Sequence, residues 1–161
     1  NLFMKIKITT ALATLMMITG ISMTATSCAT DNHSDIIETQ WEVIPITIRE
    51  NQWSWNKVAE QWEATASLPE LDKFIYESGA VLAYVFLGTA GKDEKQVQLP
   101  YVNTYFAGLD EEGYDIIFTE TISYEYKVDN GKSITFIIKS SDLFQDEDAP
   151  NNYNFRVVLI W

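Results

Sequence analysis

The chain is poor in the residues that build covalent or metal-centred sites. It has one cysteine and one histidine among 161 residues. A single cysteine excludes an internal disulfide framework and a cysteine-based zinc site, and a single histidine excludes any site that needs two imidazoles. The sequence also has no phosphate-binding loop and no dinucleotide fingerprint, because Gly88-Thr89-Ala90-Gly91-Lys92 lacks the required spacing. We therefore expect no cofactor.

Basic residues are also scarce. Eleven Lys and Arg stand against 23 Asp and Glu, which gives a formal net charge of −12. With no basic stripe to release counterions, the chain should not bind nucleic acid. Its 47% hydrophobic and 13% aromatic residues are enough to bury a core, and its length fits one domain. The composition predicts a single acidic globular domain.

The N-terminal segment has the layout of an export signal. Residues 1–3 precede the first methionine, and we take Met4 as the start. Two lysines follow, and residues 8–23 are then apolar or threonine-rich without a charge. Such a stretch is too short and too rich in threonine for a membrane-spanning helix. It leads through small residues to Cys28, after which the chain becomes polar at once.

This order of a charged start, an apolar stretch, small residues and a cysteine resembles a bacterial lipoprotein signal. The resemblance implies that residues 1–27 are removed as a signal peptide and that Cys28 is acylated. One departure is Ala25, at a position where the family usually has leucine. Two or three acyl chains contribute about 0.8 kcal/mol per buried methylene, which is enough for stable anchoring. The alternative is an ordinary cleaved signal that leaves Cys28 as a free thiol.

Charge predicts how such an anchored protein sits at a membrane. Removal of residues 1–27 leaves 9 bases and 23 acids, a net charge of −14. An anionic membrane surface repels such a domain, so the lipid on Cys28 would hold it while residues 28–40 act as a polar tether. We expect an exported protein on the outer membrane of a Gram-negative envelope, facing the periplasm or the cell surface. The domain proper would span residues 41–161.

That domain carries the patterns of an all-β fold. Pro45 cannot donate a ladder hydrogen bond, which places the first strand at a sheet edge. An apolar run between Gly79 and Gly88 predicts a central strand. Leu71, Phe74 and Ile75 recur at helical spacing and predict two or three helical turns, with a Ser67/Glu70 capping box and Gly79 after the last turn. Strands are predicted at residues 42–50, 52–57, 62–68, 80–87, 97–106 (bent at Pro100), 122–128, 134–138 and 153–161. About eight strands and one short helix predict an antiparallel two-sheet β-sandwich.

The hairpin around Asp129-Asn130-Gly131 has a predictable register. A slip of one residue would flip a strand's faces, so burial of the apolar set selects one pairing. That pairing sets Tyr126 opposite Ile134, Tyr124 opposite Phe136, Ile122 opposite Ile138, Glu125 opposite Thr135 and Lys127 opposite Ser133. A type I turn with a left-handed Gly131 would close the hairpin.

Three short segments resemble a group of uncharacterised bacterial lipoproteins. They are Gly79-Ala80-Val81-Leu82-Ala83-Tyr84, Leu99-Pro100-Tyr101 and Phe155-Arg156-Val157-Val158. The resemblance extends over about residues 40–161. It implies a β-sandwich after the lipidated cysteine and brings no activity, so it assigns no catalytic residue.

Two sets of residues are candidate ligand sites. Trp53 and Trp55 share one strand face beside polar neighbours, and exposed indoles of this kind stack on sugar rings, although large aromatics at strand positions also form cores. Asp142, Asp146 and Asp148 could supply hard ligands to calcium, although such a loop also serves as a solubilising surface and does not fit the EF-hand pattern.

The sequence favours a non-enzymatic binding or structural module on the cell envelope. The only histidine, His33, lies in the expected tether, which argues against a Ser-His-acid triad. One alternative is a glycan-binding module that uses the tryptophans. A second is a small carboxylate-dependent hydrolase, which requires two acids at a set separation in a cleft. The expected partners are the membrane through Cys28 and a glycan or an envelope protein.

Overall fold

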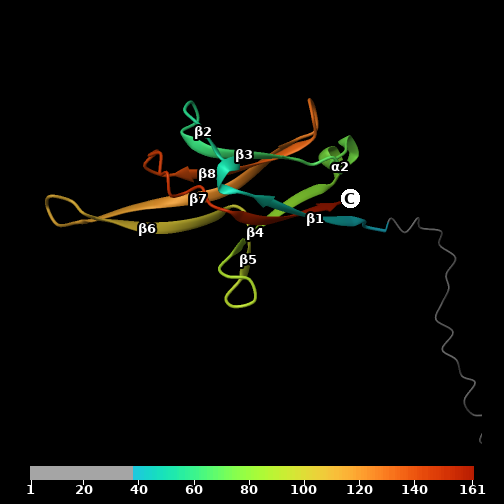
Figure 1. The fold of residues 1–161 in the computed structure, drawn as a ribbon. Helices are drawn as coiled ribbons and strands as arrows, with labels where there is room; N and C mark the ends of the chain where they lie inside the picture. Colours follow the sequence, from blue (N-terminus) through green and yellow to red (C-terminus); the bar gives the residue numbers. More distant parts are fainter. Residues whose placement is uncertain (1–37) are drawn as a thin grey trace, which may run out of the picture. The chain divides into compact units, whose positions relative to one another are not determined.

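Two antiparallel sheets face each other in the computed structural model, which describes residues 38–161 (Figure 1). The signal peptide, Cys28 and most of the tether lie outside the described residues. The four-stranded sheet has the order β1 (Trp41–Ile48), β9 (Tyr153–Ile160), β4 (Ala80–Leu87) and β5 (Lys95–Gln98). The five-stranded sheet has the order β2 (Ser54–Asn56), β3 (Gln61–Ser67), β8 (Ser133–Ser140), β7 (Asp115–Lys127) and β6 (Tyr101–Leu109). The predicted two-sheet all-β sandwich is confirmed.

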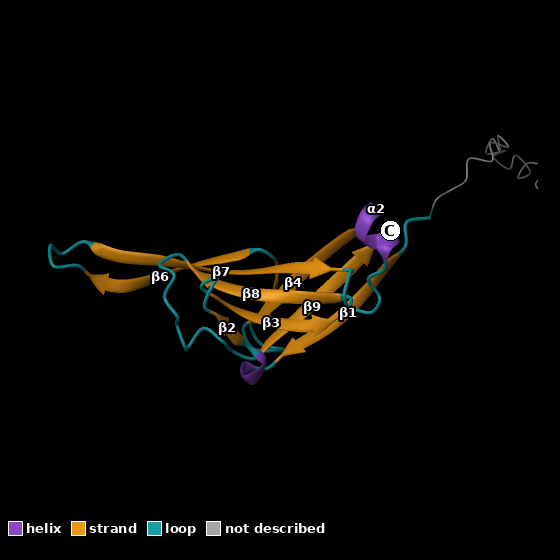
Figure 2. Cartoon of the chain, turned by 90° about the horizontal axis from the view of Figure 1, so that it is seen from above, coloured by secondary structure: helices purple, strands orange, loops and turns teal. Residues whose placement is uncertain are grey.

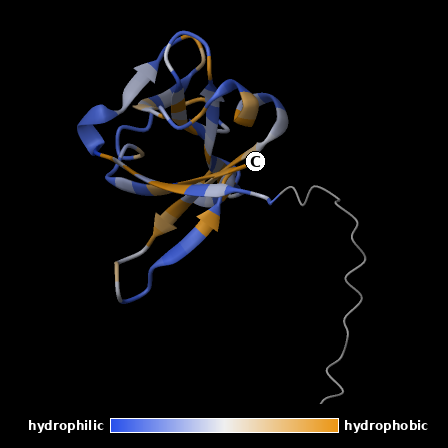
Figure 3. Cartoon of the chain, turned by 90° about the vertical axis from the view of Figure 1, so that its right-hand side faces the viewer, coloured by the Kyte–Doolittle hydropathy of each residue, from blue (hydrophilic) through white to orange (hydrophobic). Residues whose placement is uncertain are grey.

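The core lies between the sheets and follows from alternation along the strands. Successive side chains of a strand point to opposite faces, so every second residue of β8 and β9 is apolar and buried. At the centre, the rings of Phe136 and Phe155 stack across the two sheets with their centroids 3.7 Å apart. Each such side chain contributes roughly 1.5–3 kcal/mol on burial. Figure 3, coloured by hydropathy, shows apolar strand segments beside hydrophilic turns.

Several sequence predictions are confirmed. β1 contains Pro45 and is an edge strand, and β4 is interior to its sheet. The β7–β8 ladder has the predicted register at all five pairs. Gly131 is left-handed with φ of 98°. The turn type is wrong, however, because Asn130 also has a positive φ of 58°, which a type I turn does not contain.

Residues 97–106 do not form the single bent strand that was expected. β5 ends at Gln98 and β6 begins at Tyr101, and the two strands belong to different sheets. Between them Leu99 is buried, and its amide donates to the carbonyl of Ala83 at 2.9 Å. Pro100 has no N–H to continue a ladder. The chain therefore crosses from one sheet to the other at this point.

The helix is shorter than expected and starts elsewhere. α2 covers only Lys73–Ser78, and its cap is Asp72, whose Oδ1 accepts from the Ile75 amide at 2.7 Å. The Ser67/Glu70 capping box is therefore wrong. Gly79 ends the helix at the C-cap, and a Cβ there would clash with the Ile160 carbonyl oxygen. A single 3-10 turn, η1 (Glu50–Gln52), precedes β2, and no helix within residues 38–161 is long and apolar enough to cross a membrane.

The β6–β7 hairpin reaches past the rest of its sheet (Figures 1 and 2). β7 pairs with β6 from Asp115 onward but with β8 only from Glu120. Residues 105–118, which we call the overhanging arm, thus have much of their surface uncovered. The arm carries six exposed large apolar residues, namely Tyr105, Phe106, Leu109, Tyr114, Ile116 and Ile117.

Candidate functional site

The segment between β8 and β9, which we call the 141–152 loop, is held by hydrogen bonds from two tryptophans. One lies on β3 of the five-stranded sheet, and the other directly precedes β2. The Trp62 indole N–H donates to the carbonyl of Asp146 at 2.8 Å. The Trp53 indole N–H donates to the carbonyl of Asn151 at 3.0 Å. An indole N–H inside a protein needs an acceptor, and here the loop main chain supplies it. The two rings therefore position the loop.

The structure does not bring Trp53 and Trp55 together as an exposed sugar platform. Trp53 is only 7% exposed and packs edge-on against Tyr153, with ring centroids 5.9 Å apart. Trp55 is half-buried and lies edge-on against its ladder partner Trp62 at 5.5 Å. The expected exposure is thus wrong for Trp53, because the 141–152 loop and Tyr153 occupy the space around its ring. Trp53 belongs to the core, as the alternative interpretation had it.

A pocket of about 210 Å³ lies between the 141–152 loop and the core-facing side of the β6–β7 hairpin. We call it the inner pocket. Its lining combines acids, aromatic rings and small polar groups: Tyr105, Phe118, Glu120, Asp146, Asp148, Ala149, Asn151 and Tyr153. Three of these eight residues are acidic and none is basic, so the pocket has a strongly negative character.

Glu120 is the buried acid of the inner pocket. It lies two residues before the buried Ile122 on β7, and alternation turns both side chains toward the other sheet. Glu120 is only 8% exposed, and no donor within residues 38–161 hydrogen-bonds its carboxylate. Burial, with a smaller contribution from the nearby Asp146 charge, raises the pKa of Glu120 above its ordinary value. Its oxygens are not among the buried side-chain atoms without a partner, which within the described residues are Glu70 Oε2 and Ser133 Oγ, so the Glu120 carboxylate keeps contact with the solvent of the pocket.

Aromatic rings form the walls around this carboxylate. Tyr105 and Phe118 stack with centroids 5.2 Å apart and an interplanar angle of 17°. Tyr153 faces the pocket from β9, and its hydroxyl donates to the carbonyl of Ala149 at 3.4 Å. Burial, and then the Glu120 and Tyr105 side chains, raise the pKa of Tyr153 to about 12. Its phenol is therefore neutral at physiological pH.

The three aspartates predicted as calcium ligands are not brought together. Asp142 caps its own turn, because its Oδ1 accepts from the Ser140 hydroxyl and the Phe144 amide. These two hydrogen bonds lower its pKa. Asp146 and Asp148 line the inner pocket, whereas Asp142 does not. Across the described residues, no three acidic, histidine or cysteine side chains gather closely enough to hold a metal ion.

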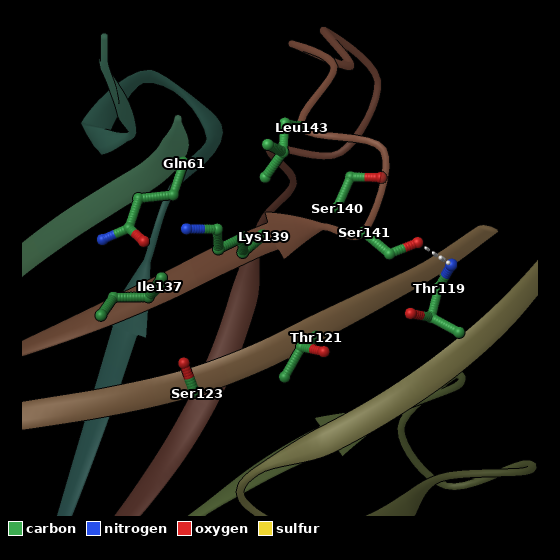
Figure 4. A pocket seen from close by; sticks show the side chains of 9 residues that line it. All are labelled: Gln61, Thr119, Thr121, Ser123, Ile137, Lys139, Ser140, Ser141 and Leu143. Atoms are coloured by element: carbon green, nitrogen blue, oxygen red, sulfur yellow. Dashed lines mark hydrogen bonds between the residues drawn. The ribbon is translucent and has the colours of Figure 1, made fainter. Parts of the chain in front are cut away.

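A second hollow lies on the opposite face of the five-stranded sheet (Figure 4). This outer groove has a volume of about 340 Å³. Hydroxyl-bearing residues dominate its lining, which consists of Gln61, Thr119, Thr121, Ser123, Ile137, Lys139, Ser140, Ser141 and Leu143. Its one charged group, the Lys139 ammonium, donates to the carbonyl of Ala59 at 2.9 Å. The outer groove thus holds no buried charge without a partner, and we rank it below the inner pocket.

One sequence signal for the inner pocket belongs to no known motif: an acid in a row of apolar strand residues. Along β7, alternation places Phe118, Glu120, Ile122 and Tyr124 on the face that is turned toward the other sheet. Glu120 is the one charged residue in this otherwise apolar and aromatic row. A carboxylate at a core-facing strand position is a candidate functional group, because it is expensive to bury there without a use.

Comparison with protein-family models, with curated proteins and with solved structures finds no match to this chain. The resemblance to lipoproteins stays a prediction from the sequence. The inner pocket is therefore the main support for a functional assignment.

Proposed function

We propose that this protein is a non-enzymatic binding module of the bacterial cell envelope, anchored by lipid on Cys28, and that the inner pocket is its ligand site. The observation that carries the proposal is Glu120, a residue that is only 8% exposed, accepts no hydrogen bond within residues 38–161 and presents its carboxylate oxygens to the solvent of the inner pocket. An acid at a core-facing strand position that opens into a pocket is a candidate functional group.

The scaffold supports this role because it holds the pocket in shape before a ligand arrives. Hydrogen bonds from Trp62 and Trp53 fix the loop wall, and the β6–β7 ladder fixes the opposite wall. A site that is already ordered loses less conformational entropy on binding. Regular strands on one side and a fastened loop on the other are suited to selective recognition.

The anchor is tested separately from the pocket. Cells that express the full chain are grown with a clickable fatty acid, and the purified protein is examined for label. We expect label on the natural chain and on the control Ser34→Ala, and none on Cys28→Ala. Label that persists on Cys28→Ala would refute the anchor.

The pocket is tested by a fragment screen on residues 38–161, which contain both sheets and the whole described core. Small amines, carboxylates and monosaccharides are titrated into ¹⁵N-labelled protein, and amide shifts are mapped. We expect at least one chemical class to move the amides of Ala149 and Asn151. Ala149→Phe, which fills the pocket, should abolish these shifts, whereas Thr121→Val in the outer groove should keep them. Shifts confined to other surfaces contradict the proposal.

A carboxylate-dependent hydrolase is the second candidate, and one observation favours it. Burial and Asp146 raise the pKa of Glu120, and a general acid needs such a shift near a second carboxylate. The test is hydrolysis of a panel of aryl glycosides by residues 38–161. Turnover that disappears in both Glu120→Gln and Asp146→Asn would establish this candidate. If no glycoside is hydrolysed, the binding module stands as the proposed function.

A further inference from the structure

We infer that the inner pocket binds an organic monocation, either a primary ammonium or a guanidinium group, with the Glu120 carboxylate as its counter-charge. This inference rests on the proposed function, since it names the ligand class of the same pocket. Four properties of the pocket support it: its negative charge, the arrangement of its acidic side chains, its aromatic walls and its volume.

The charge of the pocket favours a cation over a neutral ligand. Its lining contains Glu120, Asp146 and Asp148 and no Lys, Arg or His. Glu120 is 8% exposed as a residue and accepts no hydrogen bond within residues 38–161, and its carboxylate oxygens remain open to the pocket. An ammonium or guanidinium group would give this carboxylate both a charge and N–H donors, and such charge-assisted hydrogen bonds are the strong ones. A neutral sugar would leave the negative charge uncompensated.

The arrangement of the acidic side chains disfavours a divalent metal ion as the ligand of the pocket. Calcium takes about six to eight oxygen ligands, several of them carboxylates. In the described part of the chain, no three acidic, histidine or cysteine side chains converge to that degree. Asp148 is also exposed at the pocket rim. One buried carboxylate with acidic neighbours at the rim matches a single positive charge better.

The aromatic walls match an organic cation. Tyr105 and Phe118 form a stacked pair beside Glu120, and Tyr153 closes the other side as a neutral phenol. Ring faces attract cations within about 6 Å of the centroid, and they also cover the methylene groups that carry an ammonium. An inorganic monocation has no such methylene groups to bury.

The volume of the pocket matches a group of about the size of one side chain. The inner pocket has about 210 Å³, whereas pockets for drug-sized ligands have roughly 300–1,000 Å³. A lysine or arginine side chain of a partner protein and a free small amine share this chemistry. An extended oligosaccharide would leave most of its rings outside such a space.

The experiment is an NMR titration of residues 38–161 with four probes. These are n-butylammonium, n-butylguanidinium, neutral n-pentanol and glucose. We expect the two cations to shift the Ala149 and Asn151 amides with a Kd at least tenfold lower than that of the neutral probes. N-acetyl-lysine methylamide and N-acetyl-arginine methylamide then test the peptide source. A Kd below that of the free amines indicates a protein partner, and a higher Kd indicates a small amine.

Glu120→Gln is the decisive variant, and Glu125→Gln is its matched control on the exposed side of β7. We expect at least a tenfold loss of cation affinity in Glu120→Gln and none in Glu125→Gln. If Glu120→Gln fails to fold, Asp148→Asn at the exposed rim replaces it, with an expected threefold loss. Cation affinity that is unchanged in the variant used overturns the inference.

The remaining outcomes separate the inference from the proposed function. Glucose or pentanol that binds at the inner pocket more tightly than the cations overturns the cation inference and leaves the binding module intact. If no probe of any class shifts the pocket amides, both fail.

Discussion

The indole N–H of Trp62 on β3 donates to the main-chain carbonyl of Asp146, across 84 positions of sequence, at 2.8 Å. This bond ties the loop that carries two acids of the inner pocket to β3, an interior strand of the five-stranded sheet. We expect Trp62→Phe to retain most of the packing but to lose about 1 kcal/mol of unfolding free energy with the hydrogen bond. Urea unfolding measures the loss.

The same substitution should also loosen the loop. Amide exchange at Asp146 and Asp148 should accelerate in Trp62→Phe, because the loop loses one of the hydrogen bonds that hold it to the rest of the domain. Trp41→Phe is the control, since Trp41 is 68% exposed and should change neither measurement. Equal exchange rates in the two variants would contradict the positioning role of Trp62.

The pH dependence of stability should report the buried carboxylate. Because folding raises the pKa of Glu120, the folded state prefers the protonated form, and it loses relative stability as the pH rises above the ordinary value of 4.5. The groups that face Glu120 are Asp146 and Tyr153, and neither supplies a positive charge. Glu120→Gln should therefore have a higher Tm than the natural domain at pH 7 and the same Tm at pH 4. A lower Tm at pH 7 would mean that Glu120 has a stabilising partner.

The Phe136–Phe155 stack should dominate the stability of the sandwich. Phe136→Ala removes a fully buried ring and leaves a cavity, so we expect a loss of about 3–5 kcal/mol in unfolding free energy. Phe144→Ala is the control, because Phe144 is 69% exposed and should change stability by less than about 0.5 kcal/mol. Similar losses in both variants would be inconsistent with a core between the sheets.

The overhanging arm should bind hydrophobic dyes without contributing to stability. Phe106 and Ile117 are ladder partners and both are exposed. Thr keeps the preference for strand structure while removing most of the apolar surface. The double variant Phe106→Thr/Ile117→Thr should lower fluorescence of the dye ANS and change the unfolding free energy by less than about 1 kcal/mol. A large loss of stability would place these side chains in a packed interface.

Much of the fold follows from local pattern, because strand alternation is local information. The register of the 122–138 hairpin was predictable since a slip of one residue would expose Phe136 and Ile134 together. Pro45 likewise predicted an edge strand. Pro100 predicted only a bend in a single strand over residues 97–106, because the sequence carries no local mark of the passage to the other sheet.

The site depended on contacts between distant segments and was predicted less well. Trp53 is buried because the 141–152 loop lies over it, and the sequence near residue 53 does not predict this contact. The predicted acids Asp146 and Asp148 do line the inner pocket, but with Glu120 rather than with Asp142. The alternation along β7 marks Glu120 as an unusual acid, but only the fold shows that Asp146 lies near it.

Intermolecular NOEs between n-butylammonium and the domain test the central claim most directly. Protons of the methylene next to the ammonium should give NOEs to the ring protons of Tyr105 and Phe118. Those NOEs should vanish in Glu120→Gln. NOEs to other surfaces alone, or NOEs that persist unchanged in Glu120→Gln, would contradict a cation site built around the Glu120 carboxylate.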